Sequence, residues 1–195
     1  MSPSFLEKLS QPRPDPGGGA AAAYGGLLAL ALLAKVMQLE AIRPSNQGDR
    51  QVWEEKLAQI KQLTADLDRL REEDVRAYQR LAQTRASRSR GKEWQEAVAY
   101  ALAVPQAIMA RAGAALALVA WAGARCRKHL VSDLQVAREL LMAALQGAYR
   151  IAAANLPLLT AAAPYQESSR KLSEAAHHGN EAFLEAGEVL ESRMG

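Results

Sequence analysis

Aromatic side chains are scarce in this sequence. Only 5% of the 195 residues are Phe, Trp or Tyr, whereas 49% are apolar, with alanine and leucine dominant. Strands favour β-branched and aromatic side chains, so this composition favours closely packed helices. The apolar content is ample for a buried core, and the length fits one domain. We therefore predict a single helical domain over residues 1–195.

Cysteine is almost absent, since Cys126 is the only one. A single cysteine excludes an intrachain disulfide and is consistent with a reducing compartment, so we expect Cys126 to have a packing role. The first residues also lack the basic region that precedes the apolar stretch of a secretory signal. Both features predict a cytoplasmic protein.

No strong net charge is present, because 24 basic residues face 21 acidic ones and the formal charge is +3. A nucleic-acid footprint needs clustered Lys and Arg, so we predict no nucleic-acid partner. The one dense basic segment, residues 85–92, has no interleaved aromatics and is expected to be a solvated loop. Binding of an anionic small molecule is the alternative for this segment.

One uncharged run, residues 17–34, approaches the length of a membrane span. Much of it is Gly and Ala, and Lys35 ends it. Alanine contributes little transfer energy, so we favour a helix buried against other helices over a membrane span. No membrane partner is predicted.

Apolar periodicity and capping signals predict the helices. A short helix should follow a capping box at residues 4–7, and prolines at residues 12–16 should end it. Longer helices are predicted over about 20–40, from 49 or 50 through 81, from 92 to about 123–128 with a bend at Pro105, over 132–155 and over 165–193. With no internal repeat, heptad pattern or strand–turn–strand signal, the predicted fold is an all-α antiparallel bundle of long helices.

Asp74 is an unusual residue in this pattern, because it completes the apolar stripe of the second long helix between Leu70 and Tyr78. A carboxylate on an apolar face loses hydration unless it is paired, hydrogen-bonded or facing a cavity. An internal ion pair and a functional carboxylate are both open interpretations. A small rotation of the helix would instead turn Val75 towards the core.

Two helix starts could bind an anion or a substrate. Gly17, Gly18 and Gly19 precede a helix, where free amide donors and missing side chains allow close approach, although a flexible hinge is equally consistent. Ser132 and Asp133 begin a capping-box pattern, where a plain structural role is the alternative.

No metal site is predicted. His177 and His178 are adjacent, so they cannot share the helix face that an i, i+4 metal pair needs.

Six segments, taken in order, carry a family resemblance. They are residues 4–9 (SFLEKL), 14–22 (PDPGGGAAA), 73–78 (EDVRAY), 104–105 (VP), 131–133 (VSD) and 155–156 (NL). In this order and register they resemble the cyclodeaminase/cyclohydrolase family of folate enzymes, including the cyclodeaminase domain of formiminotransferase-cyclodeaminase and methenyltetrahydrofolate cyclohydrolase. The resemblance spans nearly the whole chain.

This resemblance implies a homodimer of all-helical protomers with a cleft for a tetrahydrofolate derivative as substrate and no prosthetic group. It implies either hydrolysis of 5,10-methenyltetrahydrofolate or cyclisation of 5-formiminotetrahydrofolate with loss of ammonia. Asp133 is then expected to act as acid and base, and Asp74 to polarise or orient the ring. The substrate-binding residues that it implies are Pro16, Gly17, Gly18, Gly19, Tyr78, Arg127, His129, Ser132 and Asn155, with Asn155 hydrogen-bonded to the pterin.

The chain also departs from the family pattern. Ala20 stands where a serine is typical, residues 41–45 (AIRPS) replace a lysine-rich segment with a tyrosine, and Arg127 and His129 replace asparagines. Such lysines would serve the anionic glutamate tail of folate, for which Arg43, Arg50 or residues 85–92 are the available substitutes. The alternative function is a helical dimer of the same family that has lost this activity or changed substrate, and acts as a binding or structural protein.

Overall fold

The computed structural model describes residues 4–87 and 91–194, apart from the side chain of Gln47. All regular elements in these residues are helical, as predicted. The α-helices are α1 (Phe5–Leu9), α2 (Gly18–Ala41), α3 (Arg50–Ala86), α4 (Lys92–Gly123), α5 (Val131–Asn155) and α6 (Ala162–Ser192). Short 3₁₀ helices join them: η1 (Pro44–Asp49), η2 (Lys128–Leu130) and η3 (Leu156–Leu158).

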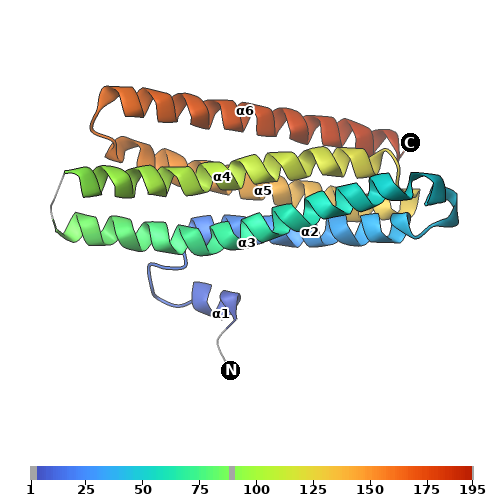
Figure 1. Ribbon diagram of the computed structural model, residues 1–195, viewed down its shortest axis with the longest axis horizontal. Helices are drawn as coiled ribbons and strands as arrows, with labels where there is room; N and C mark the ends of the chain where they lie inside the picture. Colours follow the sequence, from blue (N-terminus) through green and yellow to red (C-terminus); the bar gives the residue numbers. More distant parts are fainter. Residues whose placement is uncertain (1–3, 88–90, 195) are drawn as a thin grey trace.

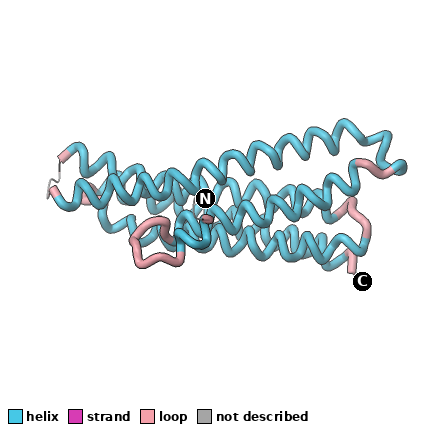
Figure 2. Tube along the Cα trace, turned by 90° about the horizontal axis from the view of Figure 1, so that it is seen from below, coloured by secondary structure: helices cyan, strands magenta, loops and turns pink. Residues whose placement is uncertain are grey.

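Helices α2 to α5 form a four-helix bundle in which each packs against two neighbours, and α6 lies along α4 and α5. Successive long helices run antiparallel, with the connections at the two ends (Figures 1 and 2). This confirms the antiparallel bundle. Helix α2 has 24 residues against 37 in α3, and it begins part-way along α3 (Figure 1).

The core follows the predicted apolar stripes. Trp53, Ile60, Leu67 and Leu70 of α3 are buried, as are most of the apolar residues on the inner sides of α2 and α4. Burial of each large side chain contributes about 1.5–3 kcal/mol, which outweighs the modest intrinsic propensity of the helices. The structure thus depends on packing between helices rather than on any helix alone.

Helices α2 and α4 are each long and apolar enough to cross a membrane by length and composition. In their most apolar windows, 50% and 56% of the residues are buried inside the bundle. Core helices of water-soluble bundles have the same character, so two such helices are weak support for a membrane span.

Two capping predictions had opposite outcomes. Ser4 Oγ accepts the Glu7 N–H at 3.2 Å and Glu7 Oε2 accepts the Ser4 N–H at 2.6 Å, which confirms the first capping box. The second capping box, at Ser132, is wrong: η2 leads directly into α5, so the N-cap is Leu130 and no side chain caps this helix. A capping residue needs a non-helical backbone, and Ser132 already lies within the first turn of α5.

The remaining helix ends differ little from prediction. Helix α2 begins two residues early, at Gly18, and α6 begins at Ala162 rather than near Tyr165. Pro105 lies inside α4, which continues to Gly123. Of the basic segment 85–92 that was expected to be a solvated loop, residues 85 and 86 end α3, residue 92 begins α4, and residues 88–90 lie outside the described residues.

Candidate functional site

A cavity of about 260 Å³ lies at the N-terminal end of α2, and we call it the Asp74 cavity. Its walls come from the connector before α2, from α3, from Ala101 of α4 and from the C-terminal end of α5. It contains six residues that the sequence marked as site candidates: Gly17, Gly18, Gly19, Asp74, Tyr78 and Asn155. Three segments more than 50 residues apart in sequence thus meet at one hollow.

The glycines allow Asp74 to reach the start of α2. Gly17 is the N-cap, with extended backbone and no side chain to cap the helix. Asp74 of α3 provides the cap instead, because its Oδ2 accepts the Ala20 N–H at 2.8 Å. The carboxylate thereby satisfies one free amide donor and lies at the positive end of the helix dipole. A Cβ atom on Gly19 would overlap the Asp74 carboxylate, so only glycine permits this approach.

Asp74 has a pKa above its ordinary value. Partial burial raises the pKa, and the hydrogen bond from the Ala20 N–H lowers it by less. Among the described residues no ion pair involves Asp74, so the ion-pair interpretation is not supported there. The structure instead gives the hydrogen-bonded, cavity-facing alternative.

The rest of the cavity wall is mostly apolar. Asn155 is held by a hydrogen bond in which its Nδ2 donates to the Ala101 carbonyl at 2.9 Å. Tyr78 lies at the edge and is 43% exposed. Pro16 does not line this cavity but an adjoining surface hollow, where Asp15 of the connector is held by the side chain of Gln79. Asp15, which lines both hollows, was not singled out from the sequence.

The other four candidates, Arg127, His129, Ser132 and Asp133, lie at the far end of α2. Asp133 Oδ2 pairs with Lys35 Nζ at 2.8 Å, and both side chains are solvent-accessible. Fifteen residues of α2 separate Lys35 from Ala20, the partner of Asp74, which corresponds to about 22 Å of helix. His129 and Ser132 are exposed near Asp133. Within one protomer the two predicted acidic residues therefore do not share a cleft.

Arg127 is occupied by Glu40, a residue that sequence analysis missed. Glu40 has no exposed surface; its Oε1 accepts from Arg127 Nε at 2.8 Å and its Oε2 from Arg43 Nη1 at 2.7 Å. Burial favours a raised pKa for Glu40, but hydrogen bonds from Arg43 and Arg127 together hold the pKa below its ordinary value. The sequence signal for the burial of Glu40 was its spacing. Glu40 lies three residues after Met37 and seven after Leu33, and both of these lie on the buried face of α2.

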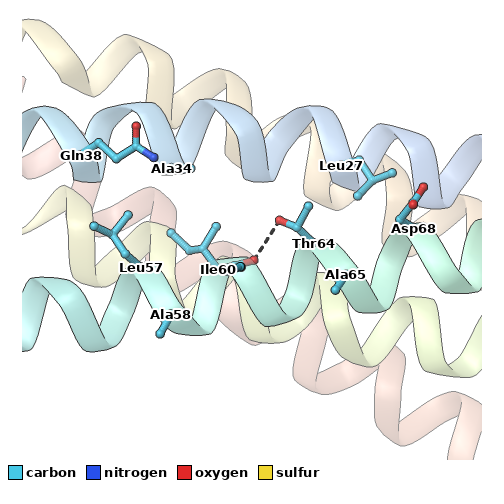
Figure 3. A pocket seen from close by; sticks show the side chains of 10 residues that line it. Leu27, Ala34, Gln38, Leu57, Ala58, Ile60, Thr64, Ala65 and Asp68 are labelled. Atoms are coloured by element: carbon cyan, nitrogen blue, oxygen red, sulfur yellow. Dashed lines mark hydrogen bonds between the residues drawn. The ribbon is translucent and has the colours of Figure 1, made fainter.

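A larger groove of about 840 Å³ runs between α2 and α3 (Figure 3). Small and apolar side chains line most of it, including Leu27, Ala34 and Ala65. The Thr64 hydroxyl in its wall donates to the Ile60 carbonyl at 2.9 Å within α3 (Figure 3). The groove holds none of the candidate residues and no convergent set of polar groups, so the smaller Asp74 cavity is the better candidate for chemistry.

No group of three or more His, Cys, Asp or Glu side chains in the described residues is arranged to hold a metal ion. Cys126 is buried, and its burial raises the pKa of the thiol. A buried thiol with a raised pKa is a poor nucleophile. The chemistry available at the Asp74 cavity is therefore that of a carboxylate, amide groups and a helix start.

The fold and this cavity define an all-helical protein whose candidate site is a partly buried carboxylate beside a glycine-rich helix start. A sequence model of the family described as formiminotransferase-cyclodeaminase matches residues 2–174. The chain belongs to this family, which confirms the resemblance drawn from the six segments.

A crystal structure of formiminotetrahydrofolate cyclodeaminase from Thermotoga maritima has the same fold, with a TM-score of 0.90. The match covers 97% of this chain and 96% of that chain at 21% identity. The chain matches none of the curated proteins. The structural likeness confirms the cyclodeaminase-like bundle, and at this identity it establishes the fold alone.

Proposed function

We propose that the protein is an enzyme of folate one-carbon metabolism that acts on the amidine carbon of a tetrahydrofolate derivative. The reaction is either cyclisation of 5-formiminotetrahydrofolate with release of ammonia, or hydrolysis of 5,10-methenyltetrahydrofolate to the 10-formyl form. Family membership supports the substrate class. The observation that carries the proposal is a carboxylate with a raised pKa, free of ion pairs among the described residues, in the Asp74 cavity.

Both reactions need such a group. The substrate amidine carries delocalised positive charge, which a carboxylate in a partly buried cavity stabilises. In hydrolysis the carboxylate takes a proton from the attacking water, and N5 receives the proton of the new hydroxyl as the C–N5 bond breaks and the 10-formyl group forms. In cyclisation the carboxylate takes the N10 proton as N10 bonds to the amidine carbon, and a proton must reach the ammonia as its C–N bond breaks. A raised pKa brings Asp74 closer to the range in which it can both accept and return a proton.

We assign proton transfer to Asp74 rather than to Asp133, which the resemblance implied for this role. Asp133 is held by Lys35 at the opposite end of α2. For Asp133 to act on the same substrate, it must reach the cavity of a second protomer. Gly18, Gly19 and Asn155 shape the cavity and bind the ring, and the proposed reaction uses no prosthetic group.

We further propose that the working form is a cytoplasmic homodimer of this single helical domain. From Gly18 to Ala34 helix α2 has no charged side chain, and Leu28, Leu39 and the C-cap residue Ile42 are exposed to solvent. A helix apolar all round is normally covered on all sides. If a second α2 crosses antiparallel near Leu28, the partner's Asp133 approaches the Asp74 cavity, because Ala20 and Lys35 lie eight and seven residues on either side of Leu28.

Two assays test the activity. Purified protein is added to 5,10-methenyltetrahydrofolate, whose near-ultraviolet absorbance is followed against the uncatalysed rate, and to 5-formiminotetrahydrofolate, with ammonia measured. Acceleration of either reaction supports the proposal and identifies which reaction dominates. No acceleration of either one would favour the alternative, a family member that has lost or changed this activity.

A separate measurement tests the dimer. Leu28→Glu places a charge at the proposed crossing point and should convert a dimer into a monomer in analytical ultracentrifugation. Leu184→Glu on α6 is the matched control, because Leu184 is also an exposed leucine. A wild-type chain that sediments as a monomer would contradict the assembly while leaving the activity assays intact.

A further inference from the structure

Pro105 creates an unusual carbonyl inside α4. In an α-helix each carbonyl accepts the N–H of the residue four positions later, and proline has no N–H. Pro105 therefore removes the donor for the Ala101 carbonyl, and its ring also pushes against that carbonyl. Ala101 is only 5% exposed, so bulk water is a poor substitute. The carbonyl needs a donor from another element.

Asn155 provides that donor. Its Nδ2 donates to the Ala101 carbonyl at 2.9 Å, across 54 residues of sequence, from the last residue of α5. Ala101 and Asn155 both line the Asp74 cavity. The proline in one helix and the asparagine at the end of another are thus joined through a single carbonyl group in the cavity wall.

This hydrogen bond fixes the orientation of the amide. An asparagine side chain presents a donor at one end and an acceptor at the other, and in isolation it can turn by 180°. Against the Ala101 carbonyl only the NH₂ end is favourable, since two oxygens would repel. Among the described residues, no hydrogen bond reaches the Oδ1 atom of Asn155. Its acceptor is therefore available to the cavity.

We propose that Pro105 is a positioning residue for substrate recognition. By leaving the Ala101 carbonyl without its helical donor, Pro105 holds Asn155 so that Oδ1 faces the cavity and accepts an N–H of a planar, amino-bearing heterocycle. On the proposed function, that heterocycle is the reduced pterin ring. With Asp74, the cavity then offers two acceptors to a ligand rich in N–H donors.

Pro105→Ala tests the orientation without any substrate. The new N–H at position 105 pairs with the Ala101 carbonyl and releases the Asn155 amide. In ¹H–¹⁵N NMR spectra the side-chain signals of Asn155, assigned with Asn155→Ala, should move towards those of a solvated amide. Gly113→Ala is the matched control, because it also favours helix in α4 and its Cβ would meet only an ordinary contact. Unchanged Asn155 signals in Pro105→Ala would overturn the proposal.

A double-mutant cycle tests the pathway through Asn155. Asn155→Ala leaves the Ala101 carbonyl without a partner and should lower the Tm, and adding Pro105→Ala should restore it by supplying a helical donor. Pro105→Ala should raise the Tm less in the wild-type background, where the new helical hydrogen bond replaces the one from Asn155 to the Ala101 carbonyl. Equal effects in both backgrounds would overturn the coupling.

The substrate readout follows from the same variants. Pro105→Ala should weaken tetrahydrofolate binding about five- to tenfold, the usual effect of one hydrogen bond, with kcat changed less than KM. In the Asn155→Ala background it should have no further effect on binding. Calorimetry with tetrahydrofolate needs no turnover, so an inactive wild type that still shows this pattern would refute the proposed reaction and support the role of Pro105. Additive losses in the two backgrounds would refute that role.

Discussion

The two ends of α2 use a carboxylate in different ways. At the start of the helix, Asp74 accepts the Ala20 N–H at 2.8 Å, and near its end Glu40 accepts the Arg127 N–H at 3.3 Å. Glu40 is completely buried and paired with two arginines, whereas Asp74 is partly exposed and has no ion pair among the described residues. The pKa of Glu40 is lowered and the pKa of Asp74 is raised.

The comparison shows that burial alone does not decide the state of a carboxylate. Burial favours the protonated form at both positions, and the arginines reverse the outcome for Glu40. Glu40 is therefore fixed as a charged anchor between α2 and the segment before η2. Asp74 keeps a proton more readily and faces a cavity, so the less deeply buried carboxylate is the one suited to chemistry.

The largest expected effect is the loss of activity in Asp74→Asn. The amide oxygen can still accept the Ala20 N–H, but it cannot take up a proton, so turnover of the folate substrate should fall about 10²–10⁴-fold. The free energy of unfolding at pH 7 should not decrease, because a poorly solvated charge has been removed. The absorbance assay and urea denaturation measure the two quantities. Activity close to wild type would refute the role of Asp74.

Glu40→Gln should show the opposite pattern. It leaves Arg43 and Arg127 without their shared anion and should lower the free energy of unfolding by about 2–4 kcal/mol. Both arginines are partly exposed, which limits the loss. Turnover measured well below the Tm should stay near wild type, since Glu40 does not line the Asp74 cavity. A stable but inactive variant would contradict a purely structural role for Glu40.

Gly19→Ala tests the steric fit at the start of α2, where Asp74 binds. The added Cβ would displace the Asp74 carboxylate, so we expect a loss of activity together with a fall of about 1–3 kcal/mol in the free energy of unfolding. Gly113→Ala in α4 is the matched control, because its Cβ meets only an ordinary contact and the change should stabilise by up to about 1 kcal/mol. If both variants changed activity and the free energy of unfolding by the same amount, the steric argument would be refuted.

The pH dependence of stability should also separate the two carboxylates. The lowered pKa of Glu40 contributes stability above its ordinary pKa, and this is lost as the pH falls through the folded-state value. The raised pKa of Asp74 acts in the opposite sense: its contribution is present below the ordinary pKa and is lost as the pH rises through the folded-state value. Glu40→Gln should therefore flatten the acid limb of a denaturation-versus-pH curve, whereas Asp74→Asn should steepen it.

Sequence patterns predicted the helices well because apolar periodicity is a local property. The position of Asp74 in the α3 stripe was visible for the same reason. The hydrogen bond from the Ala20 N–H to Asp74 could not be predicted, because only the packing of α3 against the start of α2 brings Ala20 close to Asp74. Glu40 shows the same limit: its helix was predicted, but its partner Arg127 lies 87 residues away. The capping box predicted at Ser132 from its local sequence was wrong, because η2 continues directly into α5.

The smallest expected effect on stability is that of Asp133→Asn. The Lys35–Asp133 pair is solvent-accessible, so its loss should change the free energy of unfolding by less than about 1 kcal/mol. Activity is the informative readout. If Asp133 has no part in the reaction, turnover remains near wild type; if it acts across a dimer, turnover falls as steeply as in Asp74→Asn.

Mixing subunits then distinguishes an action across the interface from one within the protomer. When the Asp74→Asn and Asp133→Asn chains are unfolded together and refolded, a mixed dimer that uses the partner's Asp133 has one intact site and one site with both changes. About a quarter of the wild-type activity should then return, because half of the randomly formed dimers are mixed. If both aspartates act within one protomer, no mixed dimer has an intact site and no activity returns. Asp133 and the Asp74 cavity would then act together by a means other than a second copy of the chain packed antiparallel along α2.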